Sequence, residues 1–311
     1  MTLNVLFAGG EMDRWSDYRS LLPEALAKAG LDARVAEQFP PEAVDYILYA
    51  PHPELTDFAP YTSLKAVFGL WAGVEQIAPN PTLKVPLTRM VDSGLTEGMV
   101  EWVTGHVLRH HLGMDAHIVN PDHTWHWAPP PLARERHVTI LGLGALGTAC
   151  AKALVALNFQ VHGWSRRQKD VPGVACRAGD VGLREALEHA QILVLLLPLT
   201  AATTDLINAD TLSWMPRGAV LLNPGRGALI DDAALLASLD AGHIAHATLD
   251  VFRQEPLPPG SPYWAHPNVT VTPHIASETR AVTSVAVIAE NMRRAEGGEP
   301  LLHLVDRQAG Y

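Results

Sequence analysis

The sequence predicts an α/β protein with two doubly wound domains, each built on a parallel sheet. A chain of 311 residues is longer than one hydrophobic core usually supports, which favours two domains. Short apolar runs alternate with helical patterns along most of the chain. These runs are rich in Val, Ile and Leu and are bounded by Gly and Pro, as expected of strands that helices cover on both faces.

The individual elements follow this alternation. We expect strands at residues 3–8, 32–37, 45–50, 65–70, 137–142, 159–164, 192–197, 219–223, 245–250 and 268–272. A helix is expected over 95–111, and the Pro-rich segment 120–136 then leads into a new strand. A long amphipathic helix is expected over 277–298, with Ser277 as its N-cap and Gly297 and Gly298 at its end. That helix would return the chain to the first domain, so we predict one domain from residues 1–98 and 280–311 and another from residues 99–279.

Composition narrows the classes of function. The formal net charge of −10 opposes binding to nucleic acids, which depends on Lys and Arg that neutralise phosphates. No apolar run approaches the ~18 residues of a membrane span, and the start of the chain shows no signal peptide. Neither Cys150 nor Cys176 belongs to a CxxC pattern, so we expect free thiols in a reducing, cytoplasmic setting. The 15 histidines show no ligand spacing such as HExxH, and we expect no metal.

The clearest motif lies in "HVTILGLGALGTACAKAL", residues 137–154. Gly142, Gly144 and Gly147 form a G-x-G-x-x-G pattern between an apolar strand and an Ala-rich helix. In a dinucleotide site, the first glycine permits the tight turn, the second lets the backbone approach the pyrophosphate, and the third lets the helix pack against the strand. An ordinary strand-to-helix turn is the alternative interpretation. The order of strand, glycines and helix favours a dinucleotide cofactor.

The next expected strand leads to Ser165, which Arg166 and Arg167 follow. A carboxylate at this position would bind the free ribose 2′-hydroxyl of NAD, whereas Ser can donate a hydrogen bond and Arg can pair with a 2′-phosphate. We therefore predict NADPH/NADP as the preferred cofactor, with NADH as the alternative. If the two arginines are only a solvated surface pair, this preference has no basis.

Three polar residues follow three later strands. Arg226 comes after 219–223, Glu255 after 245–250 and His274 after 268–272. Open α/β sheets place ligands at the carboxyl ends of their strands, so we expect these side chains to share a site. The set suits reduction of a 2-keto acid: Arg226 would bind the carboxylate and carbonyl, His274 would donate the proton, and Glu255 would stabilise charged His274. Taken singly, each could be a surface or packing residue.

These motifs, with "LLLPLT", "LDVFRQEPLP", "HPNVTVTPHIA" and the ending "VDRQAGY", resemble the D-isomer-specific 2-hydroxyacid dehydrogenase family over nearly the whole chain. Within that family the sequence is most similar to the NADPH-dependent glyoxylate/hydroxypyruvate reductase A branch. The resemblance implies Rossmann-like and flavodoxin-like domains with the active site in the cleft between them. The domain 99–279 would bind the cofactor and the other domain the substrate. It also implies a homodimer formed through the cofactor domain, with the helix 97–111 and the arm after it as the dimerising segment, although that helix could equally pack within one subunit.

The resemblance supplies further candidate contacts. Leu199 and Thr200 would lie along the cofactor, Pro224 to Arg226 would line the nicotinamide, and Asp250 would bind its carboxamide. The remaining expected cofactor residues are Ala145, Leu146, Leu197, Pro198, Thr204, Gly225 and His274.

A loop of the first domain departs from the family pattern. Ala72, Gly73 and Val74 are compatible with backbone amides that bind the substrate carboxylate, but Trp71 stands where this branch usually has Gly. Trp71 could narrow the pocket to small substrates, fill it, point away from it entirely, or pack in the core. By family position, Tyr49 and Trp264 are also candidates to line the pocket.

The sequence therefore predicts an NADPH-dependent oxidoreductase that reduces glyoxylate, hydroxypyruvate or a similar small 2-keto acid to the D-2-hydroxy acid. Its alternatives are the same chemistry on a bulkier 2-keto acid or with NAD, and related reactions on this fold such as phosphoglycerate or formate oxidation. An alternative from another class is a nucleotide-sensing scaffold that binds a protein partner. The intact set of Arg226, Glu255 and His274 argues against a purely binding role.

Overall fold

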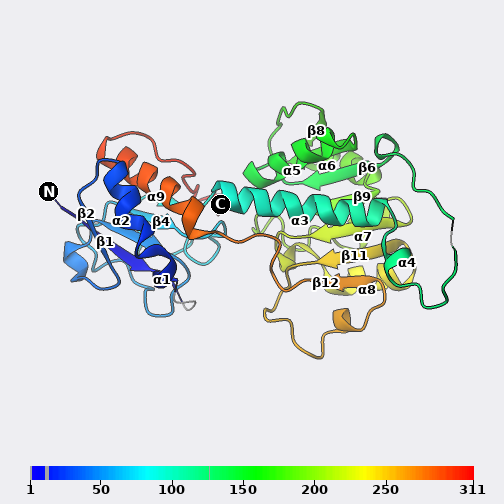
Figure 1. Ribbon diagram of the computed structural model, residues 1–311, viewed down its shortest axis with the longest axis horizontal. Coiled ribbons are helices and arrows are strands. Elements are labelled where there is room, and N and C mark those ends of the chain that lie inside the picture. The colour runs from blue at the N-terminus through cyan, green and yellow to red at the C-terminus, as the bar shows by residue number, and fades with distance from the viewer. Residues whose placement is uncertain (1, 11–13, 126) are drawn as a thin grey trace. The chain divides into compact units, whose positions relative to one another are not determined.

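The computed structural model describes residues 2–10, 14–125 and 127–311. The chain divides into two compact units, which Figure 1 shows with each element labelled. Unit 1 comprises Met1–Leu95 and Glu278–Tyr311, and unit 2 comprises Thr96–Ser277. The functional domain boundaries at 98/99 and 279/280 stay predictions.

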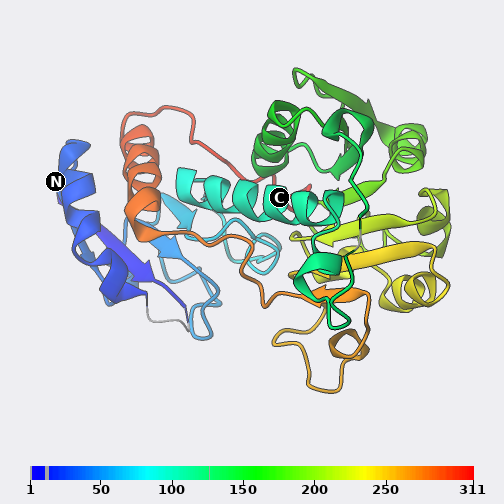
Figure 2. The ribbon, with the colours of Figure 1, turned by 45° about the vertical axis from the view of Figure 1, so that its right-hand side comes forward.

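Unit 1 is built on a parallel sheet with the strand order β2-β1-β3-β4-β5. This order, which places the second strand at one edge and the first beside the third, is that of flavodoxin-like folds. The strands are β1 (Leu3–Ala8), β2 (Ala33–Ala36), β3 (Tyr46–Tyr49), β4 (Ala66–Gly69) and β5 (Leu87–Thr88). Helices α1 (Trp15–Tyr18), α2 (Leu21–Lys28) and α9 (Ala281–Glu296) share one hydrophobic core with one face of this sheet, while irregular segments cover the other face. Figure 2 shows α9, from the end of the chain, on the same side of the sheet as α2.

Unit 2 is built on a second parallel sheet with the strand order β12-β11-β10-β9-β6-β7-β8. The first strand of this unit, β6, lies inside the sheet, with β7 and β8 on one side and β9 to β12 on the other, as in dinucleotide-binding folds. The strands are β6 (His137–Leu141), β7 (Gln160–Ser165), β8 (Val174–Ala178), β9 (Ile192–Leu195), β10 (Ala219–Asn223), β11 (Ile244–Leu249) and β12 (Val269–Val271).

Helices cover both faces of this second sheet because its strands are apolar on both sides. One core contains residues of α3 (Ser93–His111) and α5 (Ala145–Ala156). The opposite core contains residues of α6 (Gly179–Glu188), α7 (Ala209–Trp214) and α8 (Asp232–Asp240). The predicted fold class, two parallel-sheet α/β domains, is confirmed.

Two short strands and one helix start differ from the sequence expectation. All ten expected strands form, but β5 and β8 were not predicted; both are edge strands, and β8 carries Cys176 and Arg177 on a half-exposed surface. Ser277 is not the N-cap of the last helix, because residues 277–280 are not helical and α9 begins at Ala281, with Arg280 in an extended conformation before it. Ser277 instead lies beside Gly98, where a Cβ on that glycine would meet its hydroxyl at 2.9 Å.

A long loop follows the short helix α4 (Asp115–Ile118) and runs along the outside of unit 2, as Figure 1 shows. Its side chains are exposed throughout the described part. Both cysteines are free, as predicted. No helix in the described ranges is both long and apolar enough to cross a membrane.

Candidate active site

The predicted cofactor and catalytic residues of unit 2 follow consecutive strands at one edge of its sheet. Because all strands are parallel, the segments after β12, β11, β10, β9, β6 and β7 emerge in this order along the carboxyl edge. Backbone hydrogen bonds link neighbouring strand ends: Asp250 N donates to the Asn223 carbonyl at 3.0 Å, and His274 N donates to the Asp250 carbonyl at 2.8 Å. Open α/β sheets bind their ligands at this edge.

The glycine motif has the conformation that a dinucleotide requires. Gly142 has a φ of 108°, and a Cβ there would collide with the Leu196 carbonyl oxygen. A Cβ on Gly147 would collide with the Gly142 carbonyl oxygen. At Gly144, which precedes the first residue of α5, a Cβ would meet no protein atom within 4 Å. The turn therefore has no room for a side chain at Gly142 or Gly147. It is open at Gly144, where a pyrophosphate could approach the helix N-terminus.

β7 ends at Ser165, and Arg166 and Arg167 follow it directly. Ser165 is buried, and its hydroxyl donates to the Arg167 carbonyl at 2.7 Å. Arg166 and Arg167 are exposed. The Ser165 hydroxyl thus holds the turn in this structure, and the two arginines that follow it present exposed cations at this edge of the sheet.

The loop after β9 is closed by a residue that the sequence did not single out. Thr203 Oγ1 donates to the Pro198 carbonyl at 2.7 Å and accepts from Thr200 N at 2.8 Å. Leu197 is buried, Leu199 is half-buried and Thr204 is exposed. Thr203 therefore fixes the backbone of the predicted cofactor loop.

A second residue outside the prediction, Asn223, braces the turn that carries Arg226. Asn223 is fully buried; its side chain donates to the Arg226 carbonyl at 2.9 Å and accepts from Gly225 N at 3.1 Å. A Cβ on Gly227 would collide with the Phe252 backbone, so only glycine fits at position 227. Pro224 is buried and Arg226 is half-buried, with its guanidinium donating to the Gly225 carbonyl at 2.7 Å.

Asp250 is fully buried and organises the backbone around the catalytic histidine candidate. Its Oδ1 accepts from Thr272 Oγ1 at 2.5 Å and from Ile275 N at 2.9 Å, and its Oδ2 accepts from Ala276 N at 2.9 Å. These three hydrogen bonds fix the chain before His274, at Thr272, and after it, at Ile275 and Ala276. The predicted contact of Asp250 with a carboxamide stays a prediction, but its carboxylate clearly fixes the 272–276 segment.

His274 and Glu255 lie in direct contact. His274 Nδ1 and Glu255 Oε2 are 2.6 Å apart, and Glu255 Oε1 accepts from Phe252 N at 2.8 Å. The backbone of His274 has a φ of 55°, an uncommon conformation for a residue other than glycine that clusters at functional sites. The imidazole side chain is 51% exposed. Glu255 therefore orients Nδ1, and Nε2 is the nitrogen that can exchange a proton with a bound molecule.

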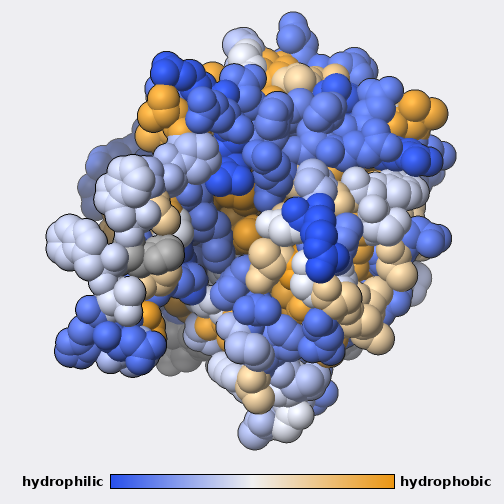
Figure 3. Space-filling view, turned by 90° about the vertical axis from the view of Figure 1, so that its right-hand side faces the viewer, coloured by the Kyte–Doolittle hydropathy of each residue, from blue (hydrophilic) through white to orange (hydrophobic). Residues whose placement is uncertain are grey.

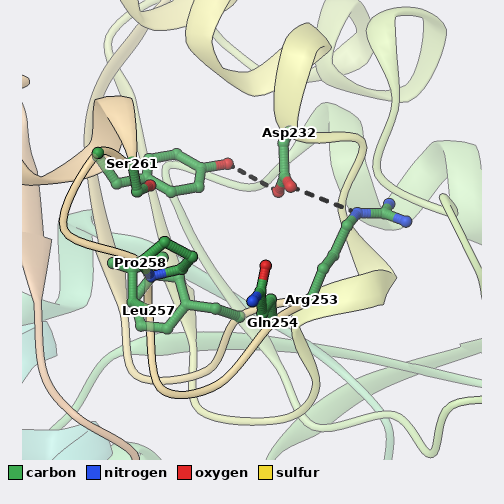
Figure 4. A pocket seen from close by; sticks show the side chains of 9 residues that line it. Asp232, Arg253, Gln254, Leu257, Pro258 and Ser261 are labelled. Carbon is green, nitrogen blue, oxygen red and sulfur yellow. Dashed lines mark hydrogen bonds and ion pairs between the residues drawn. The ribbon is translucent and has the colours of Figure 1, made fainter.

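The loop that carries Glu255 is anchored to α8. Figure 4 shows the shallow pocket that this loop forms next to α8. In this pocket, Asp232 of α8 faces Tyr263 and Arg253 of the loop. Tyr263 Oη donates to Asp232 Oδ1 at 2.9 Å, and Arg253 Nε lies 3.4 Å from Asp232 Oδ2. Burial, together with this carboxylate, raises the pKa of Tyr263, so its hydroxyl stays protonated and donates. Trp264, next to this anchor, is half-exposed and donates to the Pro258 carbonyl at 3.0 Å.

The substrate-loop candidates lie in unit 1, after the carboxyl end of β4. Ala72 and Gly73 are half-buried and Val74 is buried, while Trp71 is exposed at the start of the loop. Trp71 is therefore not packed in the core, which was one of its four interpretations. Tyr49, by contrast, is buried in the core at the end of β3, and burial raises its pKa.

Comparisons with known proteins bear on this site. Residues 106–276 match the family model described as D-isomer specific 2-hydroxyacid dehydrogenase, NAD binding domain. A D-isomer specific 2-hydroxyacid dehydrogenase from Xanthobacter autotrophicus Py2, solved in complex with NADPH and MES, is 41% identical with a TM-score of 0.92 over 100% of both chains. An NADPH-dependent glyoxylate/hydroxypyruvate reductase from Sinorhizobium meliloti, in complex with NADP and sulfate, is 34% identical with a TM-score of 0.84 over 100% of this chain and 99% of that one. A probable 2-hydroxyacid dehydrogenase from Rhizobium etli CFN 42, in complex with NADP, HEPES and L(+)-tartaric acid, is 29% identical with a TM-score of 0.85 over 100% and 99%.

Proposed function

The chain belongs to the D-isomer-specific 2-hydroxyacid dehydrogenase family, and from this premise we propose that it reduces glyoxylate, hydroxypyruvate or a similar small 2-keto acid with NADPH. The observation that carries the proposal is the His274–Glu255 pair at 2.6 Å, at the same sheet edge as Arg226 and the glycine turn. Likeness to a glyoxylate/hydroxypyruvate reductase supports the substrate class.

The cofactor fits the residues present. Gly142, Gly144 and Gly147 leave an open approach at the N-terminus of α5, and two cations follow β7 where a 2′-phosphate would lie. NADPH, when bound, supplies the hydride. The similar structures solved with NADPH or NADP support this choice over NADH.

The protein's own groups have distinct roles in the proposed reaction. Arg226 binds the carboxylate and polarises the carbonyl of the keto acid. His274 donates a proton from Nε2 to the carbonyl oxygen, and Glu255 holds the opposite nitrogen and stabilises the charged ring. In the reverse direction the same imidazole accepts the proton. Ala72, Gly73 and Val74 are proposed to offer backbone amides to the substrate carboxylate, with Trp71 and Trp264 limiting its size.

The proposed substrate class is tested by steady-state kinetics with NADPH and with NADH. Glyoxylate, pyruvate, hydroxypyruvate and phenylpyruvate form a series of increasing bulk. We expect kcat/KM to be highest for glyoxylate and hydroxypyruvate with NADPH, and far lower for phenylpyruvate. A preference for phenylpyruvate would instead support the bulkier substrate class, and turnover of no acid with either cofactor would support the nucleotide-sensing scaffold.

Arg166 is expected to determine the preference for NADPH. Arg166→Ala should raise the KM for NADPH about ten-fold or more, since it removes a charge-assisted hydrogen bond to the phosphate. The KM for NADH and the kcat at saturating NADPH should change little. Lys169→Ala, at an exposed neighbouring cation, is the matched control. Equal changes with both cofactors would show that Arg166 does not contact the 2′-phosphate.

We further propose that the protein is a homodimer. The interface would be formed by the arm of unit 2, the segment 112–136 between α3 and β6. Exposed apolar side chains gather on this arm: Ile118, Val119, Trp125, Trp127 and Leu132. Figure 3 views the molecule from the side at which the arm runs, and pale and orange patches interrupt the hydrophilic surface there. Large exposed apolar side chains, tryptophans above all, are enriched in protein interfaces.

Removing the two tryptophans is expected to dissociate the dimer. Trp125 and Trp127 are 94% and 81% exposed, so Trp125→Ala combined with Trp127→Ala should leave the fold of unit 2 intact. Light scattering after size exclusion should give twice the chain mass for the wild type and the chain mass for the double variant. Val181→Ala, at an exposed position of α6, is the control. A monomeric wild type would refute the proposal.

A further inference from the structure

A cluster of three imidazoles lies in unit 2 away from the carboxyl edge of its sheet. His137 is the first residue of β6, His162 lies within β7, and His189 follows the last residue of α6. The glycine turn lies beyond the other end of β6, so the reaction proposed above uses none of the three. Thr139 Oγ1, on the same face of β6 as His137 and opposite His162 in the ladder, donates to the Ala186 carbonyl of α6. The cluster therefore sits under the end of α6.

The three rings are close enough to share one ion. His137 Nδ1 and His162 Nε2 are 2.9 Å apart, and one nitrogen from each of the three rings lies within 4.8 Å of the others. Two imidazole nitrogens bound to one tetrahedral ion at 2.0–2.1 Å are about 3.3 Å apart, so the first pair needs to separate only slightly. The His189 ring stacks on the His162 ring at 4.7 Å between centroids. Because His189 is exposed, its side chain can rotate so that its lone pair points toward the other two nitrogens.

The charge state also suits a metal. Burial, with His189, His137 and Arg177 nearby, lowers the pKa of His162 to about 4, so this ring is neutral at pH 7. A neutral imidazole is the form that ligates. Arg177 Nη1 lies 3.4 Å from His162 Nδ1, a weak contact, while Arg177 Nε makes a 2.9 Å ion pair with Glu185. Binding at His162 Nε2 would place the proton on Nδ1; it would replace the hydrogen bond between His137 Nδ1 and His162 Nε2 by two bonds to the ion and release the weak contact to Arg177.

We propose that His137, His162 and His189 form a binding site for a divalent transition-metal cation, with Zn²⁺ as the test ion. Three imidazoles with a water as fourth ligand are a common Zn²⁺ ligand set, and imidazole also suits Ni²⁺ and Cu²⁺. The ion would tie the end of α6 to β6 and β7. It would stabilise unit 2 rather than take part in the reaction, since any ligand that binds only the folded state raises its stability.

Calorimetric titration of the chelator-treated full-length protein with ZnCl₂ tests the proposal. At pH 7.5 we expect one Zn²⁺ per chain and a Tm that rises with Zn²⁺ concentration. Replacing the exposed ligand by His189→Asn should weaken binding by at least about ten-fold and remove the Tm rise. Circular dichroism checks that the variant is folded. His117→Asn, at an exposed histidine of α4, should behave as the wild type.

The same experiment can overturn the proposal. Absence of Zn²⁺ binding by the wild type would do so, as would a titration of His189→Asn that matches the wild type.

Discussion

Replacing His274 by Ala is expected to lower kcat for keto-acid reduction by about 10²- to 10⁴-fold, the usual contribution of a positioned general acid. The side chain is half-exposed, so the fold should not depend on it. Binding of NADPH, followed by its fluorescence, should be almost unchanged. A loss of NADPH binding equal to the loss of kcat would show that His274 supports the cofactor site rather than the proton transfer.

The partner of His274 gives a graded control. Glu255→Gln keeps an oxygen near Phe252 N but removes the negative charge beside His274 Nδ1. We expect a smaller fall in kcat than for His274→Ala, because the imidazole remains but loses the carboxylate beside Nδ1. A kcat equal to that of the wild type would show that the reaction does not need the negative charge of Glu255.

Replacing Asp250 by Ala is expected to have the second-largest effect, on both stability and turnover. The change leaves three donors, Thr272 Oγ1, Ile275 N and Ala276 N, without their buried acceptor. Hydrogen bonds to charged groups contribute about 1.5–3 kcal/mol each, so the free energy of unfolding should fall by about 3 kcal/mol or more. The left-handed backbone of His274 loses its anchor at the same time, so kcat should fall more than KM rises.

Two variants separate these effects. Thr272→Val removes one of the three donors and should give a smaller loss of both quantities. Asp170→Asn, at an exposed carboxylate, should change neither. Urea unfolding gives the stability and steady-state kinetics give the turnover. If Asp250→Ala unfolds at the wild-type urea concentration, the carboxylate does not anchor this segment.

The sequence predicts the fold well where local pattern and tertiary structure agree. The strands β6, β9 and β10 are buried apolar runs, and the glycine motif between β6 and α5 is a local feature that needs no knowledge of the rest of the chain. Edge strands are harder, because β8 is paired on one side only and half-exposed, so it lacks an apolar run. The start of α9 was placed too early because the polar residues 277–280 read equally well as a helix start and as extended chain.

The site was predicted less completely than the fold, for a physical reason. Residues directly after strands, such as Arg226 and His274, can be found because parallel strands end at one edge. The bracing residues Asn223 and Thr203 act through short-range bonds to the backbone that only the folded turn reveals. The imidazole cluster depends on the pairing of β6 with β7 and on where α6 ends, so no spacing in the sequence indicates it.

The most direct test of the central claim is the chirality of the product formed from hydroxypyruvate and NADPH. The account predicts stoichiometric oxidation of NADPH and formation of D-glycerate, with almost none formed by His274→Ala. Formation of L-glycerate, or oxidation of NADPH at the wild-type rate by His274→Ala, would contradict it.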